Sequence, residues 1–153
     1  MDETSRDAVF ERVSDEAGWQ AAKAIRVRVF VEEQACPPEE EFDEWDSRSQ
    51  HLLVRLAGEP AATARWREVK KWGQRWAKLE RFAVLPEVRG GGMGRRLVDF
   101  AMGQARAAGH HRFLIHAQAH LQSFYESFGF HVHGEPFDEA GIPHLLMTAE
   151  EAS

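Results

Sequence analysis

Short apolar runs, several alternating with polar positions and bounded by Gly, Pro, Ser or Asp, predict seven β-strands. Residues 58–60 and the pair Trp72-Gly73 lie between such runs and contain residues that favour tight turns, so they predict two hairpins. The predicted strands cover residues 9–13, 51–57, 61–68, 77–85, 112–117, 130–134 and 144–149.

Apolar positions recur at helical spacing in three further segments. The first helix begins at residues 14–16, which contain Ser and Asp, and continues to about Val31. The second covers residues 95–108 and stops before Gly109, and the third, shorter helix covers residues 119–128. Strands and helices interleaved over 153 residues predict one α/β (mixed α+β) domain, residues 1–153, with a central mixed sheet and helices on both faces.

A glycine-rich stretch, Arg89-Gly90-Gly91-Gly92-Met93-Gly94, joins a predicted strand to the second predicted helix. Glycines allow a close approach of the backbone to an anion, and the first amides of a helix lack partners within it, so the stretch is suited to a pyrophosphate. The residues after Gly94 are Arg95 and Arg96 rather than the Lys and Ser/Thr of a P-loop, and the G-x-G-x-x-G dinucleotide fingerprint is absent. Coenzyme A is the best remaining candidate, and a simple tight turn is the alternative.

A second motif, Phe124-Tyr125-Glu126-Ser127-Phe128-Gly129-Phe130, follows a later predicted strand. Together with Arg89, Gly92 and Gly94 it resembles the motifs of the GNAT superfamily of acetyl-CoA-dependent N-acetyltransferases. A narrower resemblance, to the ElaA-like branch, covers nearly the whole chain. Its segments are residues 28–34, 36–37, 51–52, 117–122 and 141–144. The resemblance implies the GNAT fold and acetyl-CoA as cosubstrate, but no firm acceptor.

The resemblance also implies where the coenzyme lies. In GNAT proteins the pantetheine runs beside the strand that precedes the glycine-rich stretch. Gln118 stands where many members have Asn, so its hydrogen bonding can differ. The implied coenzyme-binding residues are Phe82, Ala83, Val84, Arg89, Gly90, Gly91, Gly92, Met93, Gly94, Arg95, Gln118, Ser123 and Tyr125.

Acetyl transfer to an amine requires a proton acceptor for the amine, a polarised thioester carbonyl and a proton donor for the departing thiolate. Tyr125 is the only tyrosine and occupies the position whose hydroxyl lies near the coenzyme sulfur in much of the family, so we expect it to be the general acid. Glu80 alternates with Phe82 and Val84 along one strand face and is the predicted base.

Three other kinds of chemistry are open at this stage. His116 and His120 are rival bases, because imidazoles take up protons near neutral pH. Cys36 could carry the acetyl group in a two-step transfer, but no partner base is evident in the sequence, so direct transfer is expected. His131 and His133 share a strand face without an evident third ligand, so no metal is expected.

The expected acceptor is a small or peptide-borne primary amine. The acidic run of residues 39–46 could attract a cationic amine, or it could be a solvated loop. The predicted acceptor-binding residues are Arg28, Glu33, His51, His120 and His144.

Charge and composition restrict the partners. A net charge of −6 disfavours general nucleic-acid binding, although the basic residues 65–78, with Trp66, Trp72 and Trp76, leave base stacking as an alternative. No apolar run reaches the roughly 20 residues that span a bilayer, and residues 1–7 lack a signal-peptide core. With a single cysteine, these features predict a cytoplasmic protein, monomeric or homodimeric, without membrane contact.

Two other functions remain open. The chain could be a non-catalytic CoA-binding regulator, or it could catalyse another acyl transfer such as acyl-homoserine-lactone synthesis, whose enzymes Arg26-x-x-Val29-Phe30-Val31 faintly resembles. Release of free thiol from acetyl-CoA in the presence of amines would distinguish an N-acetyltransferase from a binding module.

Overall fold

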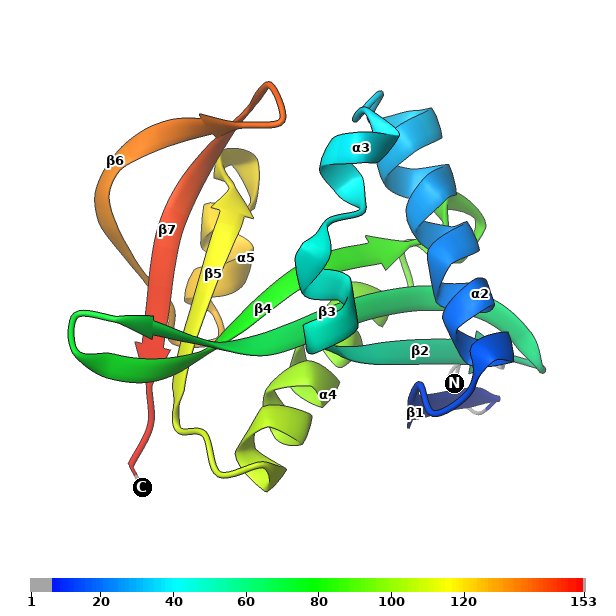
Figure 1. The fold of residues 1–153 in the computed structure, drawn as a ribbon, viewed down its shortest axis with the longest axis horizontal. Helices are drawn as coiled ribbons and strands as arrows, with labels where there is room; N and C mark the ends of the chain where they lie inside the picture. The colour runs from blue at the N-terminus through cyan, green and yellow to red at the C-terminus, as the bar shows by residue number, and fades with distance from the viewer. Residues whose placement is uncertain (1–6, 153) are drawn as a thin grey trace.

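The computed structural model describes residues 7–152, which form a seven-stranded mixed sheet with helices on both faces (Figure 1). Most of the polar opening segment, for which we expected no signal-peptide core, lies outside the described residues. The predicted fold class is confirmed. In the sheet order β1-β2-β3-β4-β5-β7-β6, the strands are β1 (Ala8–Arg12), β2 (Gln50–Leu56), β3 (Glu59–Lys71), β4 (Gln74–Val84), β5 (Arg112–Gln118), β7 (Ile142–Glu150) and β6 (His131–Glu139).

The parallel pair β4 and β5 creates a split in the sheet. All other neighbouring strands are antiparallel, and the parallel register covers only Ala77–Leu79 against Phe113–Ile115. Both strands continue beyond this register, and Figure 1 shows them spreading apart toward α3 and the turn between β6 and β7. Side chains at the carboxyl ends of β4 and β5 therefore face a common cavity.

Helices pack on opposite faces of the sheet. On one face, α2 (Glu16–Arg26) is capped by Asp15, which accepts a 2.7 Å hydrogen bond from the Gly18 amide, and continues into the π-helical segment η1 (Val27–Glu33). On the other face, α4 (Met93–Ala107) buries its apolar side in the main core. The remaining elements are α3 (Pro38–Glu41), η2 (Glu44–Arg48), η3 (Pro86–Val88), η4 (Ala119–Leu121) and α5 (Gln122–Glu126).

Strand β4 carries a bulge before its carboxyl end. Arg81 has a φ of +57°, and the register against β3 shifts so that Arg81 and Phe82 together lie opposite Ala64. One extra residue in a strand inverts the faces to which all later side chains point. The side chains after the bulge therefore change faces.

The bulge makes one expectation wrong. Phe82 and Val84 pack against the core cluster that contains α4, whereas Ala83 packs in the smaller cluster with Ile25 of α2. Glu80 precedes the bulge and pairs with Arg65, which shares Asp46 with Arg26 of α2, so Glu80 lies on the α2 face. Glu80, Phe82 and Val84 do not share one face, because the alternation that we extrapolated is interrupted at Arg81.

The long β3–β4 hairpin accounts for the predicted cluster of tryptophans. Trp66 and Trp76 are buried in the sheet, and Trp72, at the turn, is 56% exposed. Trp72 contacts the rings of Trp76 and His133. Two of the three aromatic rings that could have stacked on bases are therefore occupied by packing. Within residues 7–152, no helix is long and apolar enough to cross a membrane.

Candidate active site

A cavity of about 1110 Å³ lies in the split between β4 and β5. One wall comes from η1, α3 and the loop that follows it, and the other comes from β5 and the β6–β7 turn. Of the predicted site residues, those that line it are Glu33, Glu80, Phe82, Arg89, Gln118, His120, Tyr125 and His144. The fold thus brings the predicted acid, the predicted base and the first residue of the glycine-rich stretch to one cavity.

The glycine-rich stretch forms an open cradle at the start of α4. Gly90 and Gly92 have φ values of +93° and +81°, a region that favours glycine, and a Cβ built on either would meet no atom within 4 Å. Gly92 is the N-cap residue of α4 and makes no side-chain hydrogen bond to the helix amides. The first amides of this 15-residue helix are therefore available to an anion, which fits a pyrophosphate.

Arginines near the cradle are engaged by the protein itself. Arg89 donates to both carboxylate oxygens of Glu33 at 2.7 Å, and its Nε donates to the Val84 carbonyl at 2.9 Å. Arg95 lies over the Phe128 ring and donates to the Ser127 hydroxyl. Arg89 therefore connects the cradle to η1, and its paired guanidinium is a weaker phosphate ligand than the sequence suggested.

Tyr125 is a buried phenol in the cavity wall. Its side chain is 6% exposed, packs edge-on against Phe124 and Phe130, and lines the cavity. Burial raises the pKa of the Tyr125 hydroxyl, so the phenol is protonated at neutral pH. The raised pKa also makes this phenol a weaker acid than a thiol, so it can protonate the sulfur only if the phenolate regains a proton in the same step.

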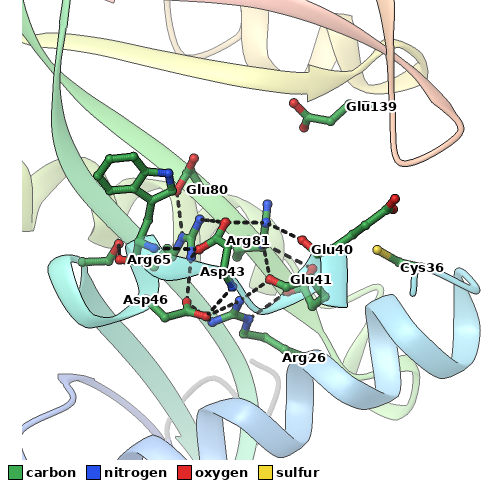
Figure 2. Close-up of polar contacts among 12 residues, drawn as sticks. Arg26, Cys36, Glu40, Glu41, Asp43, Asp46, Arg65, Glu80, Arg81 and Glu139 are labelled. Atoms are coloured by element: carbon green, nitrogen blue, oxygen red, sulfur yellow. Dashed lines mark hydrogen bonds and ion pairs between the residues drawn. The ribbon is translucent and has the colours of Figure 1, made fainter. Parts of the chain in front are cut away.

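Glu80 is surrounded by three cations, of which Figure 2 shows Arg65. Its carboxylate lies 2.7 Å from Arg65 Nε, 3.2 Å from Arg67 Nε and 3.0 Å from Lys78 Nζ. Burial alone would raise the pKa of Glu80, but Lys78, Arg65 and Arg67 outweigh it and lower the pKa to about 2. Such a carboxylate has little tendency to take a proton from an amine, so the structure argues against Glu80 as the base.

Three of the six carboxylates of the acidic run form ion pairs with arginines that reach them from other elements. Glu41 accepts from Arg26 Nε at 2.8 Å, and Asp46 accepts from Arg26 and from Arg65 at 2.7 and 2.6 Å. Asp43 accepts from Arg65 at 2.9 Å, and Figure 2 shows these groups as one network between α2, α3 and the sheet. This part of the run therefore fixes the cavity wall, and its paired carboxylates fit neither of the two alternatives left open by the sequence, free charges that attract a cationic amine or a solvated loop.

A second polar group lies on the opposite wall. His116 Nδ1 of β5 is 2.9 Å from Glu139 Oε1, and His144 Nε2 of β7 is 3.7 Å from Glu139 Oε2. All three residues line the cavity. We did not identify Glu139 from the sequence, and the one available signal was its place two residues before the segment 141–144 that resembles the ElaA-like branch.

Two predicted acceptor-binding residues lie away from the cavity lining. Arg28 is exposed and forms two hydrogen bonds with Glu87, at 2.8 and 3.0 Å. His51 stacks on Trp19, and its Nε2 lies 2.7 Å from the Asp46 carbonyl oxygen. Neither residue contributes to the cavity surface, so the structure gives no support to their predicted role.

The remaining predicted residues differ in position. Gln118 donates to the Gln34 side chain at 3.2 Å, while Ser123 is exposed on α5. Cys36 lines the cavity, but burial raises the pKa of its thiol, which disfavours a thiolate nucleophile. His133 bonds to Thr148, and among residues 7–152 no three His, Cys, Asp or Glu side chains are grouped to hold a metal ion.

Comparison with known proteins agrees with this arrangement. Residues 12–151 match the family model described as the acetyltransferase (GNAT) domain. The uncharacterized N-acetyltransferase YjcF of Bacillus subtilis (strain 168) is 38% identical over 127 residues, which cover 82% of this chain and 88% of YjcF.

Solved structures show the same fold over nearly the full length. Escherichia coli ElaA superimposes with a TM-score of 0.81 at 28% identity, covering 94% of this chain and 99% of ElaA. An acyl-CoA N-acyltransferase from Pseudomonas aeruginosa has the same TM-score and identity, covering 94% of this chain and 98% of its own. The chain belongs to the GNAT family of acetyltransferases.

Proposed function

We propose that this protein transfers an acetyl group from acetyl-CoA directly to a primary amine of a small molecule or peptide. The observation that carries the proposal is that Arg89, at the start of the cradle, and the buried phenol of Tyr125 line the same cavity. The related Pseudomonas aeruginosa protein, described as an acyl-CoA N-acyltransferase, supports the same class of reaction.

In this proposal the cradle amides of α4 hold the pyrophosphate, and the pantetheine lies beside β4 near Phe82 and Val84. The cosubstrate supplies an activated acetyl group. Tyr125 gives its proton to the sulfur as the carbon–sulfur bond breaks and the new carbon–nitrogen bond forms. The acceptor nitrogen becomes positively charged when it bonds to the acetyl carbon, and it gives its extra proton to the phenolate as the amide forms, so Tyr125 ends the cycle as it began.

Direct transfer is favoured over a covalent acetyl-enzyme. The sole cysteine, Cys36, is the one thiol available, and its raised pKa leaves little thiolate at neutral pH. An amine that attacks the thioester itself requires no nucleophile from the protein. The kinetic consequence is a ternary complex rather than ping-pong behaviour.

Free-thiol release from acetyl-CoA across a panel of primary amines, with product masses determined, tests the proposal. Tyr125→Phe keeps the ring and removes the hydroxyl, so we expect an unchanged calorimetric CoA affinity and a kcat about 10²- to 10⁴-fold lower. Wild-type kcat in a folded Tyr125→Phe variant would remove Tyr125 from the mechanism. CoA binding by the wild type without acetylation of any amine would instead favour a non-catalytic CoA-binding module.

A further inference from the structure

Glu139 differs from the carboxylates on the opposite wall of the cavity. Glu41, Asp43 and Glu80 each form an ion pair with an arginine. Among the described residues, the basic side chains within 4.0 Å of the Glu139 carboxylate are two histidines, His116 and His144, which are charged only when protonated. Figure 2 shows Glu139 across the cavity from the arginine network. It is therefore a carboxylate without a permanent cationic partner.

The hydrogen bond between His116 and Glu139 determines the tautomer of the imidazole. The hydrogen bond from His116 lowers the pKa of Glu139 below its usual range and outweighs burial, which by itself would raise this pKa. The carboxylate is therefore ionised and can only accept. His116 Nδ1 must then carry the hydrogen that spans the 2.9 Å to Glu139 Oε1. The other ring nitrogen, Nε2, keeps a free lone pair on a side chain that is 28% exposed and lines the cavity.

His144 of β7 lies beside the same carboxylate. Its Nδ1 lies 2.7 Å from the Ile142 carbonyl oxygen, which can only accept, so this nitrogen carries a hydrogen. Its Nε2 faces Glu139 Oε2 at 3.7 Å. The ring of Phe137 packs edge-on against His116 at 5.1 Å and covers one side of the imidazole. The imidazole of His116 thus contacts two residues of β6, Glu139 and Phe137, and His144 of β7 lies next to Glu139.

We propose that His116 is the general base that takes the proton from a cationic primary-amine acceptor, and that Glu139 is the residue that positions its imidazole. This inference rests on the proposed acetyl transfer. The inference assigns the role of base to an imidazole with a free lone pair. It no longer assigns this role to Glu80, whose carboxylate forms ion pairs with three cations.

The proton transfer is balanced without a further reactant. One N–H bond of the acceptor ammonium breaks and its electron pair stays on nitrogen, while the proton bonds to His116 Nε2. The imidazolium that forms is stabilised by the ionised Glu139 on Nδ1, as in other base–carboxylate pairs. His116 returns the proton to solvent after the product leaves, so each turnover releases one proton.

The charges around His116 favour a cationic acceptor. The charged or titratable groups near the His116–Glu139 pair are His144 from β7 and Lys78 from β4, whose charge also acts on Glu139. Lys78 lies 3.0 Å from Glu80, and among the described residues no lysine or arginine lies within 4.0 Å of Glu139. An ammonium group beside Glu139 would therefore form the direct ion pair that this carboxylate lacks, which holds the amine beside the base.

The test compares His116→Gln and Glu139→Gln with two matched controls on β6, His131→Gln and Asp138→Asn, whose side chains are exposed. With an alkylamine whose pKa is about 10, we expect kcat/KM of His116→Gln to fall about 10²- to 10⁴-fold. Glu139→Gln removes one charge-assisted hydrogen bond and should lower it about 10- to 100-fold. The controls should keep the wild-type value.

A second amine separates proton abstraction from packing. With an acceptor amine that is already neutral at the assay pH, the loss in His116→Gln should shrink to below about tenfold, because less deprotonation is required. An equal loss for both amines would mean that His116 acts through structure. An unchanged kcat/KM in His116→Gln, with wild-type turnover intact, would overturn the inference and leave the proposed acetyl transfer standing.

The tautomer can be read without turnover. Long-range ¹H–¹⁵N spectra of the wild-type protein above neutral pH should show His116 protonated at Nδ1 and unprotonated at Nε2. Glu139→Gln should weaken this preference, whereas Asp138→Asn should not. A His116 protonated at Nε2 in the wild type would overturn the inference, whatever the activity assays give. If the wild type acetylates no amine, the proposed function fails by its own experiment.

Discussion

Replacing Glu80 with Gln separates the two roles considered for this residue. The substitution keeps the shape of the side chain and removes one negative charge that faces Arg65, Arg67 and Lys78 at 2.7 to 3.2 Å. The residue is only 9% exposed, so water cannot replace the lost charge. If Glu80 is structural, the variant should be less stable; if it is the base, the variant should be inactive.

The expected loss of stability follows from the pKa. The pKa of Glu80 falls from its ordinary value of 4.5 to about 2. At roughly 1.36 kcal/mol per pKa unit, this shift corresponds to about 3 kcal/mol of folding stability. Because the pKa is lowered in the folded state, this stabilisation is fully present above about pH 4.5 and is lost as the pH falls toward about 2. At about 2 to 4 °C per kcal/mol for a domain of this size, Tm should fall by roughly 6 to 12 °C.

Urea unfolding of the wild type and Glu80→Gln at pH 7, repeated in steps below pH 4.5, measures this difference. Glu68→Gln is the matched control, because Glu68 is 43% exposed and lies 3.8 Å from Arg75. We expect the difference in free energy of unfolding between the wild type and Glu80→Gln to become smaller as the pH falls. We expect kcat at pH 7 to change less than about tenfold. A variant as stable as the wild type whose kcat falls 100-fold or more would refute the reasoning and restore Glu80 as the base.

Two further substitutions test the cradle and the buried network. Gly92→Val forces a β-branched residue to a φ of +81°, so we expect CoA to bind at least tenfold more weakly by calorimetry. Gly103→Ala, inside α4, is the control. If both variants bind CoA with the same affinity, the glycine-rich stretch is not the CoA-binding cradle. Arg26→Met removes the 2.8 Å partner of the buried Glu41, which keeps Arg81 at 3.2 Å, and should cost about 1.5 to 3 kcal/mol in urea unfolding. Arg106→Met removes the exposed ion pair with Glu151 and should lower the free energy of unfolding by less than about 1 kcal/mol. Similar losses in Arg26→Met and Arg106→Met would contradict a buried network around Arg26.

The sequence by itself determined the features that depend on neighbouring residues. Apolar periodicity located each strand to within a few residues, although β3 and β6 extend beyond the runs that predicted them. The glycines of residues 90–94 marked the start of α4, and the motif around Tyr125 placed the phenol. Both motifs are read from consecutive residues, because a helix start and a helix end are local structures.

The tertiary structure alone decided the chemistry of the cavity. Arg26 comes from α2 and Arg65 from β3, and their ion pairs neutralise three of the six carboxylates that the sequence presents as free charge. The bulge at Arg81 turned Phe82 and Val84 to the face opposite Glu80, although two-residue alternation placed all three on one face and the sequence shows no sign of the bulge. Glu139 meets His116 across 23 positions of sequence, through the pairing of β5, β7 and β6. A pKa depends on every charge within a few ångströms, and those distances are set by strand order and register, which no local pattern specifies.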